Sequence, residues 1–158
     1  MDSICFRLSF DYLVLATDIS NKVLKKAETA IYTEENIGGI PEEIKKNSLL
    51  KSRERSNGLY KIGPEVRNNV KFRVLNLMDD DFKLREEFDI IFFRNVQIYF
   101  KLETRKKILI RILSYLKPGG HLFLGYSENI SSIELDLDCV DQCIYRKPFY
   151  KAELINKD

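Results

Sequence analysis

The sequence has few of the residues that build metal centres or disulfide frameworks. Its 158 residues include three cysteines and one histidine. Cys5, Cys139 and Cys143 form no CxxC pair, and none stands at metal-ligand spacing from His121. We therefore expect no metal site, and we interpret Cys139 and Cys143 as small, partly buried apolar residues of a protein in a reducing compartment.

Long apolar runs and a strong excess of either charge are also missing. The longest apolar stretches are short and interrupted by charge, so none is expected to span a bilayer. Asp2 and Arg7 make the N-terminal stretch a poor secretory signal. The net charge is only +2, from 26 basic and 24 acidic residues, which is no general signal for nucleic-acid binding. We expect a cytoplasmic protein that neither inserts into a membrane nor binds nucleic acid.

Several motifs that identify common enzyme classes do not occur. The chain has no GxGxxG, GxxxxGK[ST], HExxH or GxSxG, so nicotinamide, phosphate-loop, zinc-protease and serine-hydrolase functions have no support. What is present is 44% hydrophobic and 32% charged residues with four prolines, a composition typical of a folded domain. A chain of this length can bury a sizeable core.

Strand-like and helix-like segments alternate along the chain. Buried strands are predicted at 12–16, 70–75, 88–93 and 120–125, and amphipathic helices at 21–29 and 102–116, the second stopping at the KPGG that follows. The tail 133–145 predicts two more strands that meet around 138–141. This alternation indicates an α/β fold with a mostly parallel sheet and a C-terminal antiparallel hairpin. We predict one domain over residues 1–158.

The segment before residue 70 differs in character. A short helix is expected at 42–50, and Leu59–Ile62 alternates with a period of two, as a short antiparallel strand does. From Lys45 to Arg73 there are nine basic residues against two acidic ones. We predict a small antiparallel β insert over 45–69 whose charge favours an acidic partner, with a solvated charged loop as the alternative.

Polar side chains stand where three of the predicted strands end. Asp18 comes just after the first strand, Asn76 ends the second, and Arg94 and Asn95 follow the third. In open parallel sheets the ligand lies beyond the carboxyl ends of the strands, so one crevice is expected to collect these groups. The carboxylate of Asp18 is suited to accept hydrogen bonds from the two hydroxyls of a ribose.

The chemistry of these residues indicates a nucleoside-bearing cofactor. Asn76 offers one acceptor and two donors to a base edge, beside the apolar wall of Leu77. Arg94 presents a planar fork suited to a carboxylate, and Asn95 can orient it. Simpler interpretations remain open, with Asp18 as a helix cap, Asn76 as a turn former and Arg94 as a surface arginine.

Five blocks of the sequence resemble the chemotaxis receptor methyltransferases, which are CheR-type protein-glutamate O-methyltransferases that use S-adenosylmethionine. In order and spacing they cover nearly the whole chain from Asp11 to about Arg146: LATDIS at 15–20, VKFRVLNL at 70–77, FDIIFFRNVQIYF at 88–100, LKPGGHLFLGYSENI at 116–130, and 140–145. The resemblance implies a Rossmann-like methyltransferase sheet. It also implies transfer of a methyl group from S-adenosylmethionine to glutamates of chemotaxis receptors during sensory adaptation.

The resemblance assigns roles to the residues at the strand ends. Asp18 would hold the ribose hydroxyls of the cofactor, and Asn76 and Leu77 would lie along its adenosine. Arg94 and Asn95 would line the pocket near its amino-acid portion. The site would therefore assemble from all three strand ends.

Two further residues of the FDIIFFRNVQIYF block are singled out. Tyr99 would face the transferring methyl group and help to position the receptor glutamate, the alternative being an aromatic core residue. Gln97 stands where leucine is commonest in the family. Because methyl transfer from a sulfonium to a carboxylate removes both charges, it depends on alignment and exclusion of water rather than on an acid or base.

The resemblance also bears on the basic insert and on the N-terminal residues. The resemblance implies binding to the cytoplasmic domain of methyl-accepting receptors through the basic insert, in some members by strand addition. The family's N-terminal helical domain and its S-x-G-E-E-x-Y-S turn are not found, so we expect an incomplete sheet lacking its first central strand. Residues 4–10 would replace that strand or be the remnant of a helix. The alternative function is a non-catalytic receptor-binding module or an inactive fragment of such an enzyme.

Overall fold

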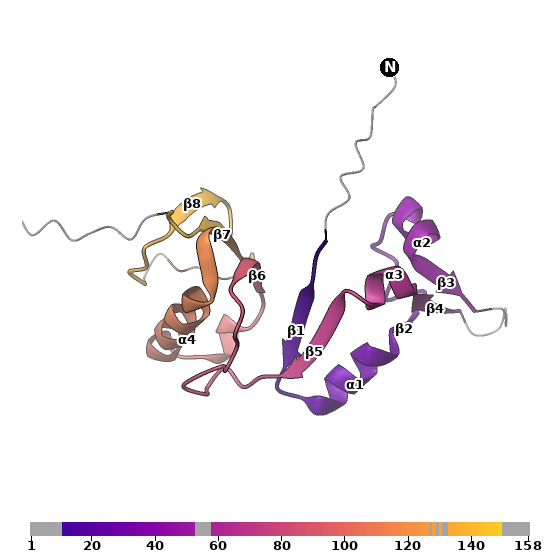
Figure 1. Cartoon of the computed structure of the whole chain (residues 1–158), viewed down its shortest axis with the longest axis horizontal. Coiled ribbons are helices and arrows are strands. Elements are labelled where there is room, and N and C mark those ends of the chain that lie inside the picture. Colours follow the sequence, from indigo (N-terminus) through magenta and orange to yellow (C-terminus); the bar gives the residue numbers. More distant parts are fainter. Residues whose placement is uncertain (1–10, 53–57, 127, 129, 131–132, 150–158) are drawn as a thin grey trace, which may run out of the picture. The chain divides into compact units, whose positions relative to one another are not determined.

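The computed structural model describes residues 11–52, 58–126, 128, 130 and 133–149. These residues belong to two compact units, the first ending at Asn76 and the second beginning at Leu77 (Figure 1). The leader at residues 4–10 lies outside the described residues, so both expectations for it stay predictions, as does the single domain over residues 1–158.

The first unit contains a parallel pair of strands with a helix between them in sequence. Strand β1 (Val14–Asp18) pairs with β5 (Val70–Val74), and helix α1 (Asn21–Thr29) packs against both strands and buries Leu24. The helix is confirmed at its predicted bounds. The strand expected at 12–16 lies two residues later, because its ladder extends to a hydrogen bond from the Leu75 N–H to the Asp18 carbonyl.

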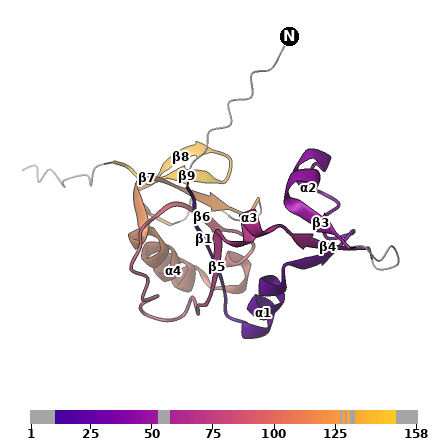
Figure 2. The same cartoon turned by 45° about the vertical axis from the view of Figure 1, so that its right-hand side comes forward.

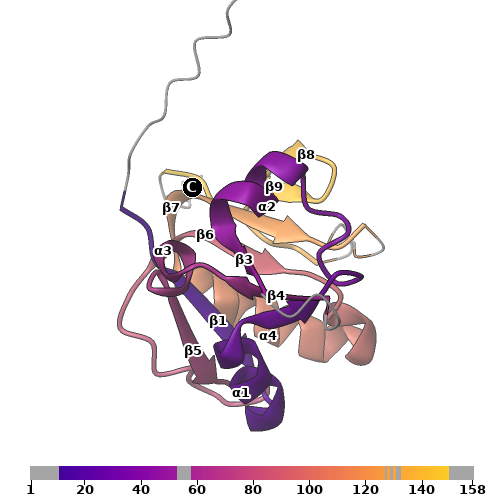
Figure 3. The same ribbon diagram turned by 90° about the vertical axis from the view of Figure 1, so that its right-hand side faces the viewer.

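A small antiparallel sheet forms the rest of the first unit (Figure 3). Its central strand is β4 (Leu59–Ile62), which lies between β2 (Ile31–Thr33) and β3 (Leu49–Lys51). Helix α2 (Glu42–Ser48) precedes β3, and helix α3 (Pro64–Arg67) leads from β4 to β5. The helix expected at 42–50 ends two residues early, because its last two residues pair with β4 instead.

The second unit is built on a four-stranded sheet. Its order is β6 (Phe88–Phe93), β7 (Leu116–Leu124), β9 (Ile144–Arg146) and β8 (Asp138–Asp141), with β6 and β7 parallel and the other pairs antiparallel (Figure 2). The 3₁₀ turn η1 (Gln97–Tyr99) and helix α4 (Leu102–Ser114) join β6 to β7. The mixed α/β class, with parallel strands and a C-terminal antiparallel hairpin, is confirmed.

The boundaries in this unit differ from expectation around the end of α4, which is Ser114 and not residue 116, and in the C-terminal tail. Strand β7 begins at Leu116 and runs through the KPGG that was expected to separate the helix from the strand. The stretch pairs because the Gly119 N–H donates to the Lys147 carbonyl and the Lys147 N–H to the Gly120 carbonyl, while Gly119 takes a φ of 77° that suits glycine. Residues 138–141 form β8 itself, and the chain turns after them at Cys143, which has a φ of 62°.

The core of the second unit lies between α4 and the sheet. The helical stripe predicted from the sequence buries Ile108, Leu109 and Ile112, and the facing strand β7 buries Leu116 and Leu122. The ammonium of Lys147 donates to the carbonyls of Leu113 and Leu116 at 2.8 and 2.6 Å, which satisfies groups left open where the helix ends. The prediction of partial burial is wrong for Cys139, which is exposed, and agrees with the structure for Cys143, which is half-buried.

Among the described residues, each parallel pair has a strand with a free edge, since β1 pairs only with β5, and β6 pairs only with β7. The described part of the chain contains no helix long and apolar enough to cross a membrane.

Gln97 is the one polar side chain of this core that has no partner among the described residues. It is 1% exposed, and neither its Oε1 nor its Nε2 forms a hydrogen bond. An amide buried in this way costs about 1 to 3 kcal/mol. We therefore expect Gln97→Leu, which keeps a similar volume, to raise the free energy of unfolding by about that amount in urea denaturation.

Gln142→Leu is the matched control, because Gln142 is exposed in the turn between β8 and β9. Its effect should stay within about 0.5 kcal/mol. A Gln97→Leu variant no more stable than the original chain would contradict this account of the buried amide.

Candidate functional site

The first group of predicted site residues lies at the end of the β1 and β5 pair. Asp18 is the last residue of β1 and pairs in register with Val74, two residues before Asn76. Both Asp18 and Asn76 are half-buried. The parallel ladder therefore brings these two predicted residues to the same end of the pair.

The carboxylate of Asp18 does not cap α1 in the way its alternative interpretation supposed. Ser20 is the N-cap, and its hydroxyl accepts from the Val23 N–H. One oxygen of Asp18 accepts from the Ser20 N–H at 2.7 Å, which fixes the turn after the strand. The other oxygen accepts no hydrogen bond from the described residues. The carboxylate is therefore oriented by the turn and keeps an oxygen available for a ligand.

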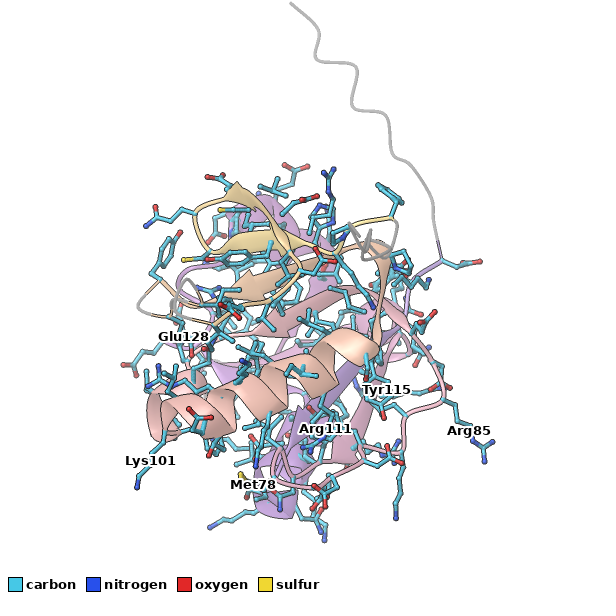
Figure 4. The ribbon with its side chains drawn as sticks, turned by 90° about the vertical axis from the view of Figure 1, so that its left-hand side faces the viewer. Met78, Arg85, Lys101, Arg111, Tyr115 and Glu128 are labelled. Carbon is cyan, nitrogen blue, oxygen red and sulfur yellow. The ribbon has the colours of Figure 1, made fainter. Side chains whose placement is uncertain are left out.

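The loop that begins at Leu77, after β5, is part of the second unit. Helix α4 of the same unit holds this loop. Arg111 donates to the Leu77 carbonyl at 3.3 Å, reaches the Asp80 carboxylate at 3.4 Å, and lies over the ring of Phe82 at 5.4 Å. Figure 4 shows Arg111 on the helix above the loop that carries Met78. The position of Leu77, predicted to lie along an adenosine, thus depends on Arg111.

Tyr115, the C-cap residue of α4, holds the same loop four residues after Arg111. Its hydroxyl donates to Asp81 at 2.8 Å, and its ring stacks on Phe82 with centroids 5.9 Å apart. The Lys83 N–H and the Tyr115 hydroxyl together hold the pKa of the Asp81 carboxyl below its ordinary value. Sequence reasoning missed both Arg111 and Tyr115, although their spacing of four residues places them on one helix face.

The second group lies at the end of β6. Arg94 follows the last residue of the strand, and Asn95 takes a φ of 58°. The carboxylate of Glu128 accepts from the backbone N–H groups of Asn95, Val96 and Gln97 at 3.0, 2.8 and 2.8 Å. It also accepts from the Gly125 N–H at 2.7 Å. One buried side chain therefore ties the turn after β6 to the end of β7.

The charge of Glu128 is stabilised where it lies. The side chain is only 5% exposed, and this burial acts to raise the pKa of its carboxyl. The four backbone N–H groups outweigh the burial and hold that pKa below its ordinary value. The ionised form is thus the one that the fold favours.

Gly125 is needed where the two strand ends approach each other. A Cβ at this position would lie 2.7 Å from Asn95 Oδ1 and 2.8 Å from Glu128 Oε2. The next residue, Tyr126, is 80% exposed, and the guanidinium of Arg94 lies 5.9 Å from the centre of its ring. An exposed cation–π pair therefore stands beside the turn.

Tyr99 lies on the surface at the end of η1 and is 78% exposed. Its interpretation as an aromatic core residue is therefore wrong. Its phenol is accessible to a ligand or partner, which the predicted role requires.

The predicted site residues fall into two groups, each within its own unit. Asp18 and Asn76 belong to the first unit, and Leu77, Arg94, Asn95 and Tyr99 belong to the second. Sequence reasoning missed Gly125, Tyr126 and Glu128, although all three lie in the LKPGGHLFLGYSENI block. A polar turn at the end of a strand parallel to β6 is the signal that could have found them.

Comparison with known proteins decides the family. Residues 4–145 match the family described as CheR methyltransferase, SAM binding domain. The chain belongs to this family. S-adenosylmethionine is the cofactor of the domain that the match covers.

Chemotaxis protein methyltransferases are similar over most of the chain. Those of Klebsiella aerogenes and Escherichia coli are 39% and 36% identical over 132 residues, which is 84% of this chain and 46% of each relative. That of Borreliella burgdorferi is 36% identical over 141 residues, 89% of this chain and 48% of the relative. The chain therefore spans about half the length of the curated CheR relatives that it matches.

The depressed pKa of Glu128 predicts a particular loss of stability in acid. A carboxyl whose pKa is lower in the folded chain contributes stability that is present above its unfolded pKa and is lost as the pH falls through its folded value. We expect Glu128→Gln to lower the free energy of unfolding by roughly 3 kcal/mol at neutral pH, because buried N–H groups lose their acceptors. This difference should shrink as the pH falls below about 4.5, the ordinary value for a glutamate.

Urea denaturation of both chains across a pH series measures the difference. Glu134→Gln is the control, since Glu134 is exposed on the same segment and carries the same charge. A Glu128→Gln penalty that stays constant from neutral to acid pH would show that the ionised carboxylate does not stabilise the turn.

Proposed function

We propose that this chain binds S-adenosylmethionine and transfers its methyl group to glutamate side chains of methyl-accepting chemotaxis receptors. The observation that carries the proposal is the family match, because residues 4–145 include every residue predicted for the site. The relatives named chemotaxis protein methyltransferase support the same receptor class. The setting would be sensory adaptation in the cytoplasm.

The residues of the first strand ends suit an adenosine. Asp18 has one carboxylate oxygen fixed by the Ser20 N–H at 2.7 Å and one that accepts nothing from the described residues. That second oxygen would accept from a ribose hydroxyl, in a charged hydrogen bond worth about 1.5 to 3 kcal/mol. Asn76 and Leu77 would lie along the base, with Leu77 held by Arg111 at 3.3 Å.

The residues after β6 suit the reacting end. The guanidinium of Arg94 would meet the amino-acid portion of the cofactor, with Asn95 beside it, and the exposed Tyr99 would position the acceptor glutamate. When bound, S-adenosylmethionine supplies a methyl group on a positively charged sulfur. The protein then needs to align a glutamate oxygen in line with it and keep water out, which calls for positioning residues and no nucleophile of its own.

The proposal requires both groups of residues to contact one cofactor molecule. The Asp18 carboxylate and the Arg94 guanidinium must then lie within about 10 Å of each other in the liganded protein. A structure of the complex with a larger separation would refute the shared site.

Calorimetric titration of the chain with S-adenosylhomocysteine tests the cofactor site. We expect binding in the micromolar range and a loss of about ten- to a hundredfold in Asp18→Ala, the equivalent of one charged hydrogen bond. Asp11→Ala is the control, because Asp11 is an exposed aspartate of the same unit. Absence of binding, or equal binding by Asp18→Ala, would count against the proposal.

A second candidate function is a receptor-binding module without catalysis, and the small sheet favours it. Among the described residues, neither β2 nor β3 pairs with a strand on its outer edge. An open edge of this kind is where a peptide adds as a further strand. Lys46, Lys51 and Lys61 are exposed, whereas Lys45 is paired with Glu42 at 2.7 Å. The predicted basic character of the insert is therefore partly neutralised and partly available to an acidic receptor surface.

Charge reversal in the insert tests receptor binding separately from cofactor binding. Lys46→Glu combined with Lys61→Glu should weaken binding to an acidic receptor-helix peptide by about two- to thirtyfold, since each exposed ion pair contributes about 0.2 to 1 kcal/mol. Fluorescence anisotropy at low and high salt would measure it. The control is Lys22→Glu together with Lys25→Glu, on the exposed side of α1. Equal losses in both pairs of variants would show that the insert has no special role.

A further inference from the structure

The carboxylate of Glu128 has no capacity left for a ligand or a proton transfer. Its Oε1 accepts from the N–H groups of Val96 and Gln97, and its Oε2 from those of Asn95 and Gly125. A carboxylate has about four acceptor positions, so all of them are used inside the protein. The side chain is also 5% exposed. Any contribution to binding or catalysis must therefore pass through the groups that Glu128 holds.

The groups that it holds form a turn that needs an anion. Three consecutive backbone N–H groups, from Asn95 to Gln97, converge on one side chain. Successive N–H groups that point in one direction make a concave site for negative charge. The turn also contains the left-handed φ of 58° at Asn95, a conformation that asparagine adopts more readily than most residues with a side chain. Glu128 is the internal anion of this turn.

The turn lies between the two residues of the second unit that the proposed function uses most. Arg94 immediately precedes the first of the held N–H groups, and Tyr99 comes two residues after the last. Arg94 and Tyr99 are both exposed, so neither is fixed by burial of its own side chain. Their positions depend on the path of the backbone between them.

We propose that Glu128 is a positioning residue of the cofactor site, which sets the placement of Arg94 and Tyr99 by holding the turn between them. This inference rests on the proposed function, because it takes Arg94 and Tyr99 as residues that meet cofactor and substrate. The hydrogen bonds of the Glu128 side chain go to the backbone N–H groups of Asn95, Val96, Gln97 and Gly125. Glu128 acts through the main chain, and the negative charge of its carboxylate is the property that matters.

The test compares Glu128→Gln and Glu128→Asp with Glu134→Gln, the exposed control. S-adenosylhomocysteine binding is measured by calorimetry on the full chain, at a temperature where each variant is folded. Glu128→Gln should lose affinity on the order of tenfold, as is usual when a group that orients a binding residue is removed. Glu128→Asp, which keeps the charge, should recover part of the loss, and Glu134→Gln should bind like the original chain.

A double-mutant cycle with Arg94→Ala separates positioning from general weakening. If Glu128 acts through Arg94, the losses of affinity from Glu128→Gln and Arg94→Ala should not add, because the second change removes what the first displaces. Fully additive losses would overturn the inference. Undiminished affinity in Glu128→Gln would overturn it as well.

Amide hydrogen exchange gives a readout that needs no ligand. The N–H groups of Asn95, Val96, Gln97 and Gly125 should exchange faster in Glu128→Gln while those in α4 stay protected. Unchanged exchange at all four would refute the role of Glu128 whatever the binding data show. If the original chain fails to bind S-adenosylhomocysteine, the proposed function fails, and exchange alone then decides whether Glu128 holds the turn.

Gly125→Ala provides a second perturbation should Glu128→Gln fail to fold. Its added Cβ would lie 2.7 Å from Asn95 Oδ1 and 2.8 Å from Glu128 Oε2, so it displaces the turn without changing any charge. It should reduce affinity and increase exchange at the same four N–H groups. Normal affinity and exchange in Gly125→Ala would contradict the dependence of the site on this turn.

Discussion

The hydrogen bonds between one buried carboxylate and four backbone N–H groups organise the polar end of the second unit. Where β6 and β7 end, the sheet ladder can no longer satisfy the main chain, and the N–H groups of the turn still need acceptors. Glu128, which follows β7 in the chain, supplies these acceptors to the N–H groups of residues 95–97 after β6 and to that of Gly125. The two strand ends are thereby held together at the point where Arg94 leaves the sheet.

The same arrangement recurs after β5 with different chemistry. There the loop that begins at Leu77 is held from above by helix α4, through a guanidinium on a carbonyl and a phenol on a carboxylate. In both places residues with no predicted ligand contact determine where the predicted ligand contacts lie. Loops that carry function are generally positioned by rigid elements in this way. Polar groups of the helix and of the segment after β7 thus position the loops of the candidate site, while apolar side chains of α4 and β7 form the core.

The apolar pattern of the sequence predicted those elements whose residues follow one another in the chain and form a recognisable local pattern. Helix α4 was recognised because its apolar side chains recur at helical spacing, and strand β6 because residues 90–93 form a continuous apolar run. The three-residue strands β2 and β3 were not, because their pairing with β4 is nonlocal and no local preference distinguishes them. Asp18, Asn76 and Arg94 were selected because strand ends concentrate ligand-binding groups, and their roles stay predictions. Glu128 was not, because its partners are backbone N–H groups up to 33 residues away and main-chain donors leave no mark in a sequence.

At position 97 the main chain and the side chain have opposite effects on stability. The backbone N–H of Gln97 is one of the donors that Glu128 holds, and any residue but proline would supply it. The side chain amide, 1% exposed and without partners among the described residues, works against the apolar core around it. A local conflict of this kind is tolerated because the conformation of the turn is determined by charge-assisted hydrogen bonds to its main chain, which are stronger than the bonds the amide forgoes. The turn therefore keeps its conformation despite the unfavourable side chain of Gln97. Its conformation depends on the carboxylate of Glu128 rather than on the side chains of the turn.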